Sequence, residues 1–139
     1  MTEIRWKQRF ENFEKAFLRL KEGLELAAKN PQDQLYQEGM VQRFEYTFEL
    51  GWKTLKDYLE YSKISFDEIT PRKVIKAAFA ANILPQAQTW IDMLDDRNLM
   101  AHTYQQQAFN KVIAQINNSY FAAIAATYVF FKEKLGDKK

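Results

Sequence analysis

The stretch QEGMVQRFEYTFELGWKTLKDYLEYS, residues 37–62, decides the fold of this chain. Its apolar residues recur at steps of three and four, the period of a helix with one buried face; they are Val41, Phe44, Phe48, Trp52, Leu55 and Leu59. Gly51 interrupts the pattern at a cost of about 1 kcal/mol relative to alanine, unless a bulky ring or another backbone packs closely there. We therefore predict a long helix that is crossed at Gly51.

A second long helix precedes this stretch, from Ile4 to about Asn30. Its apolar residues keep the same spacing; they are Phe10, Phe13, Phe17, Leu20 and Leu24. Because proline disfavours helical geometry in the residue before it, Asn30-Pro31 should end the helix. At about 1.5 Å per residue the helix is about 40 Å long, which fits a bundle.

Three further helices follow residue 62. Thr70-Pro71 combines an N-cap residue with a proline at the first helical position, so a short helix should run from Pro71 to about Asn82. We expect it to direct four apolar residues inward: Val74, Ile75, Ala78 and Phe79. Pro85 should open the next helix, which buries Trp90, Ile91, Met93 and Leu94, and a last long helix should cover residues 108–135.

Three long helices and two short ones predict an all-α fold: an up-and-down helical bundle, similar to a four-helix bundle with additional short helices. We expect its core to contain Phe13, Phe17, Phe44, Phe48, Leu55, Ile116 and Ile124. Only four glycines and three prolines leave little turn chemistry for a sheet, and 139 residues with 47% hydrophobic content favour a single domain over residues 1–139.

Composition also limits the function. The chain has no cysteine, which excludes disulfides and thiolate catalysis, and it shows neither a signal peptide nor an apolar run long enough to span a bilayer. We therefore expect a soluble cytoplasmic protein. Its 20 basic and 18 acidic residues are too balanced to indicate strong nonspecific nucleic-acid binding.

The only histidine lies in RNLMAHTY, residues 97–104, directly after Asp95-Asp96. Residues four apart share a helix face, so Asn98 and His102 should be neighbours, with Asp95 one turn earlier. Arg97 and Tyr104 belong to an adjacent stripe, whereas Arg97 and His102 point about 140° apart.

Histidine can exchange a proton at cellular pH, and arginine offers a cationic fork for phosphate oxygens. Cleavage of RNA without metal needs a base, an acid and positive charge at the phosphorus. Because one chain supplies one histidine, a composite site requires two chains, and we expect a homodimer with its interface near residues 97–104.

A structural alternative stays open, since a cluster of His, Arg and Asp near a helix end often serves only as a hydrogen-bonded anchor. Asp92 and Asp96, at i and i+4, could hold Mg²⁺, but such pairs usually form a solvated face. We expect no metal and no cofactor.

The stretch RNLMAHTY resembles the R-x4-H-x-Y signature of HEPN domains, which are small helical bundles that pair with minimal nucleotidyltransferases. The wider chain, from about Phe10 to Phe131, resembles the nucleotidyltransferase substrate-binding proteins. The residues that carry this likeness are VQRFEYTFELGWKTLKDYLE (41–60), TPRKVIKAAF (70–79) and TWIDMLDDRNLMAHTY (89–104).

The resemblance implies a dimer that associates with a separate nucleotidyltransferase in a two-component, toxin–antitoxin-like system. In related pairs the HEPN partner is a metal-independent ribonuclease. That would make Arg97 and His102 catalytic, Asn98 supporting, and Tyr104 the residue that the partner modifies with AMP. We expect Asp95 and Asp96, like Asn98 and Tyr104, to be supporting or binding residues.

Two functions follow from these observations. The first is a non-catalytic subunit that binds a nucleotide or other substrate around Arg97 and His102 for the partner, which the near-neutral charge favours. The alternative is a metal-independent endoribonuclease toxin that the partner neutralises, which the complete Arg, His and Tyr signature favours. A purely structural interaction protein ranks third, and the chain has no Gly-Ser motif with paired aspartates that would make it a nucleotidyltransferase itself.

Overall fold

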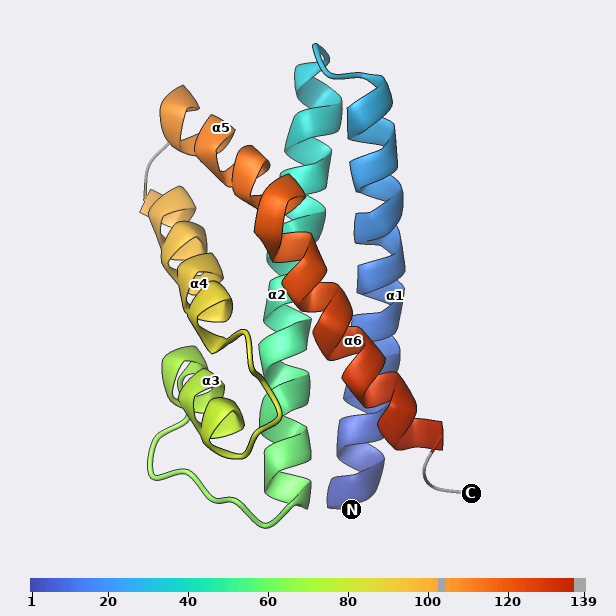
Figure 1. Ribbon diagram of the computed structural model, residues 1–139, viewed down its shortest axis with the longest axis vertical. Coiled ribbons are helices and arrows are strands. Elements are labelled where there is room, and N and C mark those ends of the chain that lie inside the picture. The colour runs from blue at the N-terminus through green and yellow to red at the C-terminus, as the bar shows by residue number, and fades with distance from the viewer. Residues whose placement is uncertain (103–104, 137–139) are drawn as a thin grey trace.

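The computed structural model describes residues 1–102 and 105–136, and every regular element within these ranges is a helix. The elements shown in Figure 1 are, in chain order, α1 (Thr2–Lys29), α2 (Gln34–Tyr61), α3 (Pro71–Ala80), α4 (Ala87–His102), α5 (Gln106–Gln115), the π-helical turn η1 (Ile116–Tyr120) and α6 (Phe121–Gly136). The predicted all-α helical bundle is therefore confirmed.

Helices α1 and α2 form an antiparallel hairpin along the whole molecule (Figure 1). Each has 28 residues, which corresponds to about 42 Å. The predicted stop at Asn30-Pro31 is confirmed, since α1 ends at Lys29. The Asp33 side chain then caps α2 by accepting a hydrogen bond from the backbone N–H of Leu35 at 3.0 Å.

The predicted crossing at Gly51 is also confirmed. A Cβ at this position would lie 2.7 Å from Cη2 of Trp90 and 3.1 Å from Cε1 of Phe13. Trp90 belongs to α4 and is fully buried. Glycine therefore lets the indole ring pack directly on the α2 backbone, and this contact offsets the poor helix propensity of glycine.

Helix α3 begins as predicted, with the Thr70 hydroxyl accepting a hydrogen bond from the backbone N–H of Lys73 at 3.2 Å and Pro71 in the first turn. It ends at Ala80, and Asn82 takes the left-handed conformation with φ of 60°. The inward prediction for Phe79 is wrong, because this side chain is 58% exposed. Pro85 precedes α4 by two residues instead of opening it.

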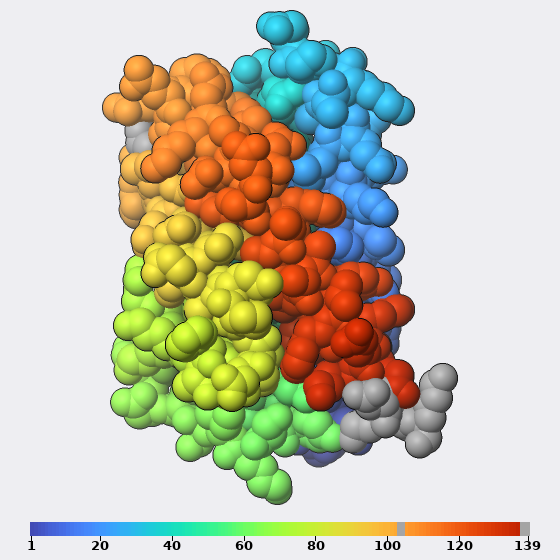
Figure 2. Space-filling view, viewed as in Figure 1, coloured from blue at the N-terminus to red at the C-terminus, as the bar shows by residue number. Residues whose placement is uncertain are grey.

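The last predicted helix is interrupted. Residues 106–136 are helical throughout, but η1 widens the turn between α5 and α6. In Figures 1 and 2 this helical segment runs diagonally across one face of the molecule, with α5 beside α4 and α6 over α1 and α2. A π-helical turn inserts an extra residue into the helical repeat, which redirects the side chains that follow it.

One cluster of buried apolar side chains joins these helices. All seven residues predicted for the core are at most 6% exposed, and Trp6, Trp90 and Phe131 are fully buried beside them. None of the helices in the described ranges is long and apolar enough to cross a membrane.

Candidate functional site

Helix α4 carries most of the predicted site residues, and a buried hydrogen bond fixes its orientation. The hydroxyl of Tyr120, the last residue of η1, donates to the Asp96 carboxylate at 2.5 Å. Tyr120 is 1% exposed and Asp96 is 7% exposed. Burial, followed by the hydrogen bond to Asp96, raises the pKa of Tyr120, so the phenol remains a donor to the carboxylate.

Asp95 connects α4 to α3. Its carboxylate lies 2.8 Å from the Arg72 guanidinium, and both side chains are about half exposed. The pair lies at the surface, where an ion pair contributes little to stability.

Arg97 faces α2 instead of open solvent. Its guanidinium donates to the Glu49 carboxylate and lies 5.4 Å from the centre of the Phe48 ring. Burial alone would raise the pKa of Glu49, but the hydrogen bond from Lys53 and the charge of Arg97 outweigh it and lower that pKa. Arg97 is therefore held between an anion and an aromatic face, a geometry that suits guanidinium.

His102, the last residue of α4, is exposed, as is Asn98 one turn earlier. The imidazole is therefore accessible to a substrate or to a second chain. Tyr104 lies outside the described residues.

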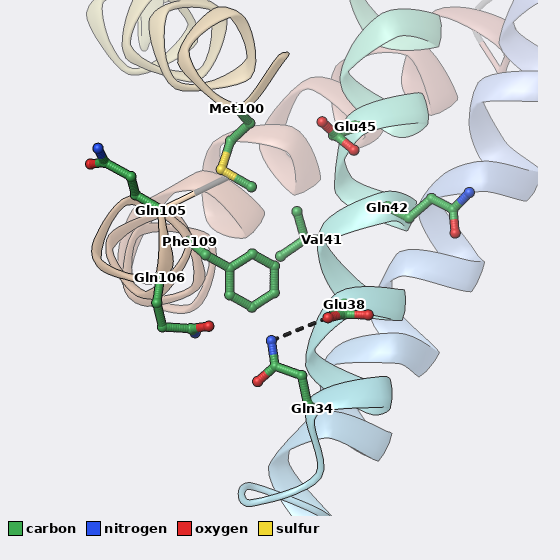
Figure 3. A pocket seen from close by; sticks show the side chains of 9 residues that line it. All are labelled: Gln34, Glu38, Val41, Gln42, Glu45, Met100, Gln105, Gln106 and Phe109. Carbon is green, nitrogen blue, oxygen red and sulfur yellow. Dashed lines mark hydrogen bonds between the residues drawn. The ribbon is translucent and has the colours of Figure 1, made fainter. Parts of the chain in front are cut away.

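A pocket of about 380 Å³ lies between α2, the C-terminal end of α4 and the N-terminal end of α5 (Figure 3). Figure 3 shows the Phe109 ring opposite Val41, with the Met100 side chain reaching toward them from α4. These three side chains give the pocket an apolar centre.

Polar groups surround that apolar centre. They are the side chains of Gln34, Glu38, Gln42, Glu45, Gln105 and Gln106. Glu45 is half-buried, and this burial raises the pKa of its carboxyl group. The positive charge of Arg97 acts in the opposite direction and lowers that pKa, but burial has the larger effect. The influence of Arg97 on Glu45 connects the pocket to the neighbouring Arg97 site.

Asp92 and Asp96, expected above to form a solvated helix face, do not both face solvent in the folded chain. Asp96 is buried against Tyr120, while Asp92 accepts a hydrogen bond from Gln88 at 3.0 Å. Within residues 1–102 and 105–136, no group of three or more His, Asp or Glu side chains is arranged to hold a metal ion.

Sequence reasoning missed the partners that other helices supply, namely Glu49 for Arg97 and Tyr120 for Asp96. Helical spacing places Tyr120 on the apolar stripe of the last helix, with Ile116 and Ile124, but a buried tyrosine hydroxyl usually needs a hydrogen-bond partner, and this requirement is a signal in the sequence. Glu45 and Glu49 recur at i and i+4 on α2, which by itself indicates only a polar helix face.

Comparisons with known proteins agree with this architecture. Residues 8–133 match the family model described as "Nucleotidyltransferase substrate binding protein like". A Haemophilus influenzae protein named "Probable ribonuclease HepT" is 30% identical over 83 residues, a match that spans 58% of this chain and 57% of that protein. A crystal structure of a protein from Thermus thermophilus has a TM-score of 0.70 and 30% identity, covering 83% of this chain and 94% of that one. The chain therefore belongs to the HEPN-type nucleotidyltransferase substrate-binding protein family.

Proposed function

We propose that this chain is a metal-independent endoribonuclease of the HEPN type, controlled by a separate nucleotidyltransferase. The observation that carries the proposal is the relative named a probable ribonuclease, at 30% identity. The exposed His102 and the cationic Arg97, on different faces of one helix, supply groups that this chemistry needs. We also propose that residues 1–139 form one domain, since one buried cluster joins the helices.

In this proposal His102 exchanges protons with the 2′-hydroxyl or the leaving oxygen, and Arg97 stabilises charge on the phosphate. Glu49 holds the guanidinium in the free chain, so a substrate phosphate would share or displace that carboxylate. Asp95 and Asp96 hold the helix that carries both groups through Arg72 and Tyr120, and Asn98 is proposed as a supporting residue one turn before His102.

One chain provides a single imidazole, and acid–base cleavage needs both a donor and an acceptor of protons. We therefore propose a homodimer in which the α4 ends of two copies approach each other. Leu99, 44% exposed between Arg97 and His102, offers apolar surface for that contact. Light scattering should give twice the chain mass at micromolar concentration; a monomer would contradict the composite site.

Cleavage of single-stranded RNA in EDTA tests the nuclease function. His102→Ala and Arg97→Ala should each lower the cleavage rate by about 10²- to 10⁴-fold, the usual contribution of acid–base groups. Arg19→Ala, which removes an exposed arginine on α1, is the matched control and should cut normally. Intact RNA with the unaltered chain would refute the proposal, and full activity in both site variants would locate the nuclease elsewhere.

The second candidate is a non-catalytic subunit that binds a nucleotide or substrate for the nucleotidyltransferase. The family description favours it, as does the pocket beside Arg97. Ligand binding without RNA cleavage, combined with a stable complex with the partner enzyme, would support this candidate over the nuclease.

Control by the partner is proposed to act on Tyr104. Transfer of AMP from ATP to the Tyr104 hydroxyl would form a phosphodiester and release pyrophosphate and the hydroxyl proton. The added negative charge, close to Arg97 and His102 in the sequence, would compete with substrate phosphate. Mass spectrometry after incubation with the partner, ATP and Mg²⁺ should find AMP on the peptide that contains Tyr104, and none with Tyr104→Phe. Modification of another residue would rule out this mechanism.

A further inference from the structure

The pocket beside Arg97 has a chemical character of its own. Its centre is apolar, with Phe109 offering an aromatic ring, and its edge carries carboxylates and amides from α2 and α5 (Figure 3). Its volume of about 380 Å³ lies within the range of small-molecule sites. A ligand that fits must therefore combine a flat apolar face with hydrogen-bonding edges.

Charge narrows the class of ligand. Among the described residues, those that line the pocket include Glu38 and Glu45 but neither lysine nor arginine. Such a lining disfavours a phosphate group inside the pocket. Single-stranded nucleic acids are commonly recognised by aromatic stacking of a base and hydrogen bonds to its edges, and this pocket offers both.

We propose that this pocket binds one base of the RNA substrate, next to the cleaved phosphate, and prefers bases that carry an exocyclic amino group. The proposal rests on the nuclease function proposed above. An ionised carboxylate only accepts hydrogen bonds, so Glu38 and Glu45 favour the amino groups of adenine, cytosine and guanine. Uracil has no exocyclic amino group: its only base-edge donor is the ring N3–H, which lies between two carbonyl oxygens that the carboxylates repel.

The position of Glu45 relates the base pocket to the cleavage site. Glu45 lines the pocket and experiences the charge of Arg97, and Arg97 is bound by Glu49 one turn further along α2. Met100, on the pocket wall, lies between Arg97 and His102 in the sequence of α4. A base in the pocket would therefore place its own backbone close to the cationic side chain and outside the acidic cavity.

The test uses the full chain and a random-sequence pool of single-stranded RNA in EDTA, with sequencing of the cut ends. Uracil should be depleted at one position beside the cut. Glu45→Gln adds an amide donor that can bind a uracil carbonyl, so uracil at that position should rise by about tenfold relative to the unaltered chain. Phe109→Ala should lower cleavage about tenfold through lost stacking.

Two matched variants control for general effects: Glu11→Gln on α1 and Phe79→Ala on α3, both at exposed positions away from the pocket lining. Each should keep the cleavage pattern of the unaltered chain. Thermal melting followed by circular dichroism checks that Phe109→Ala still folds. If Glu45→Gln leaves the uracil frequency unchanged, the base pocket is overturned while the nuclease function stands.

Binding of free nucleosides separates the two proposals. Ligand-detected NMR with adenosine, cytidine, guanosine and uridine, none of which carries a phosphate, should show binding of the first three that Phe109→Ala abolishes. The same binding without any RNA cleavage would support a base site and refute the nuclease. Nucleoside binding together with cleavage that shows no base bias would overturn the assignment to an RNA base, because the site would then serve a free nucleotide.

Discussion

Replacing Tyr120 with phenylalanine removes one hydroxyl and keeps the ring. The ring stacks on Phe44 at 5.5 Å between centroids, so packing should persist. The lost group donates to the Asp96 carboxylate at 2.5 Å in a buried setting. A hydrogen bond to a charged group contributes about 1.5–3 kcal/mol, and we expect a loss of about 2 kcal/mol in the free energy of unfolding.

Urea denaturation followed by far-UV circular dichroism measures this loss directly, and a thermal scan should show a fall of about 8 °C at about 4 °C per kcal/mol. Tyr128→Phe is the matched control, because the Tyr128 hydroxyl donates to Glu14, which also accepts from Lys132 at 2.9 Å. We expect that variant to lose less than about 1 kcal/mol.

A double-mutant cycle with Asp96→Asn tests whether the two groups act together. Paired groups in a buried network couple by about 0.5–3 kcal/mol, so the double variant should lose less stability than the two single losses added together. Strict additivity, or a Tyr120→Phe variant as stable as the unaltered chain, would refute the claim that this hydrogen bond fixes α4.

Three further predictions concern stability. Gly51→Ala should lose about 1 kcal/mol, because overpacking against Trp90 and Phe13 costs about 1–3 kcal/mol and the gain in helix propensity returns about 1 kcal/mol; Gly39→Ala, on the same helix with no atom within 4 Å of the added Cβ, should not lose stability in the same urea titration. Hydrogen bonds from Lys132 and Tyr128 lower the pKa of Glu14 below 4.5, so the contribution of Glu14 to stability is present above pH 4.5 and is lost as the pH falls through the lowered value. The Glu14→Gln variant should therefore lose less stability on acidification than the unaltered chain does. Burial raises the pKa of Glu45 above 4.5, so its contribution to stability has the opposite sign: it is present below pH 4.5 and is lost as the pH rises through the raised value. Because glutamine does not ionise, Glu45→Gln should become more stable relative to the unaltered chain over that rise in pH. Urea titrations at several pH values measure this difference in the free energy of unfolding.

The helices and their buried faces follow from local properties of the sequence. Apolar spacing predicted α1 and α2, and the Thr70-Pro71 and Asn30-Pro31 pairs predicted a start and a stop. Phe79 shows the limit of this reasoning, since apolar character alone does not state whether a neighbouring helix covers a side chain. The π turn also escaped prediction, because its sequence keeps an ordinary helical pattern.

By itself, the sequence determined that the chain is a helical bundle and that Arg97 and His102 occupy one helix on different faces. Only the tertiary structure decided that Glu49, 48 residues away, binds Arg97, that Tyr120, 24 residues away, binds Asp96, and that α2 and α5 enclose a pocket beside them. The physical reason is that helical period fixes the direction of a side chain relative to its own axis. The group that it meets depends on how separate helices pack, which is set by the fit of whole buried faces such as the Trp90 ring on Gly51.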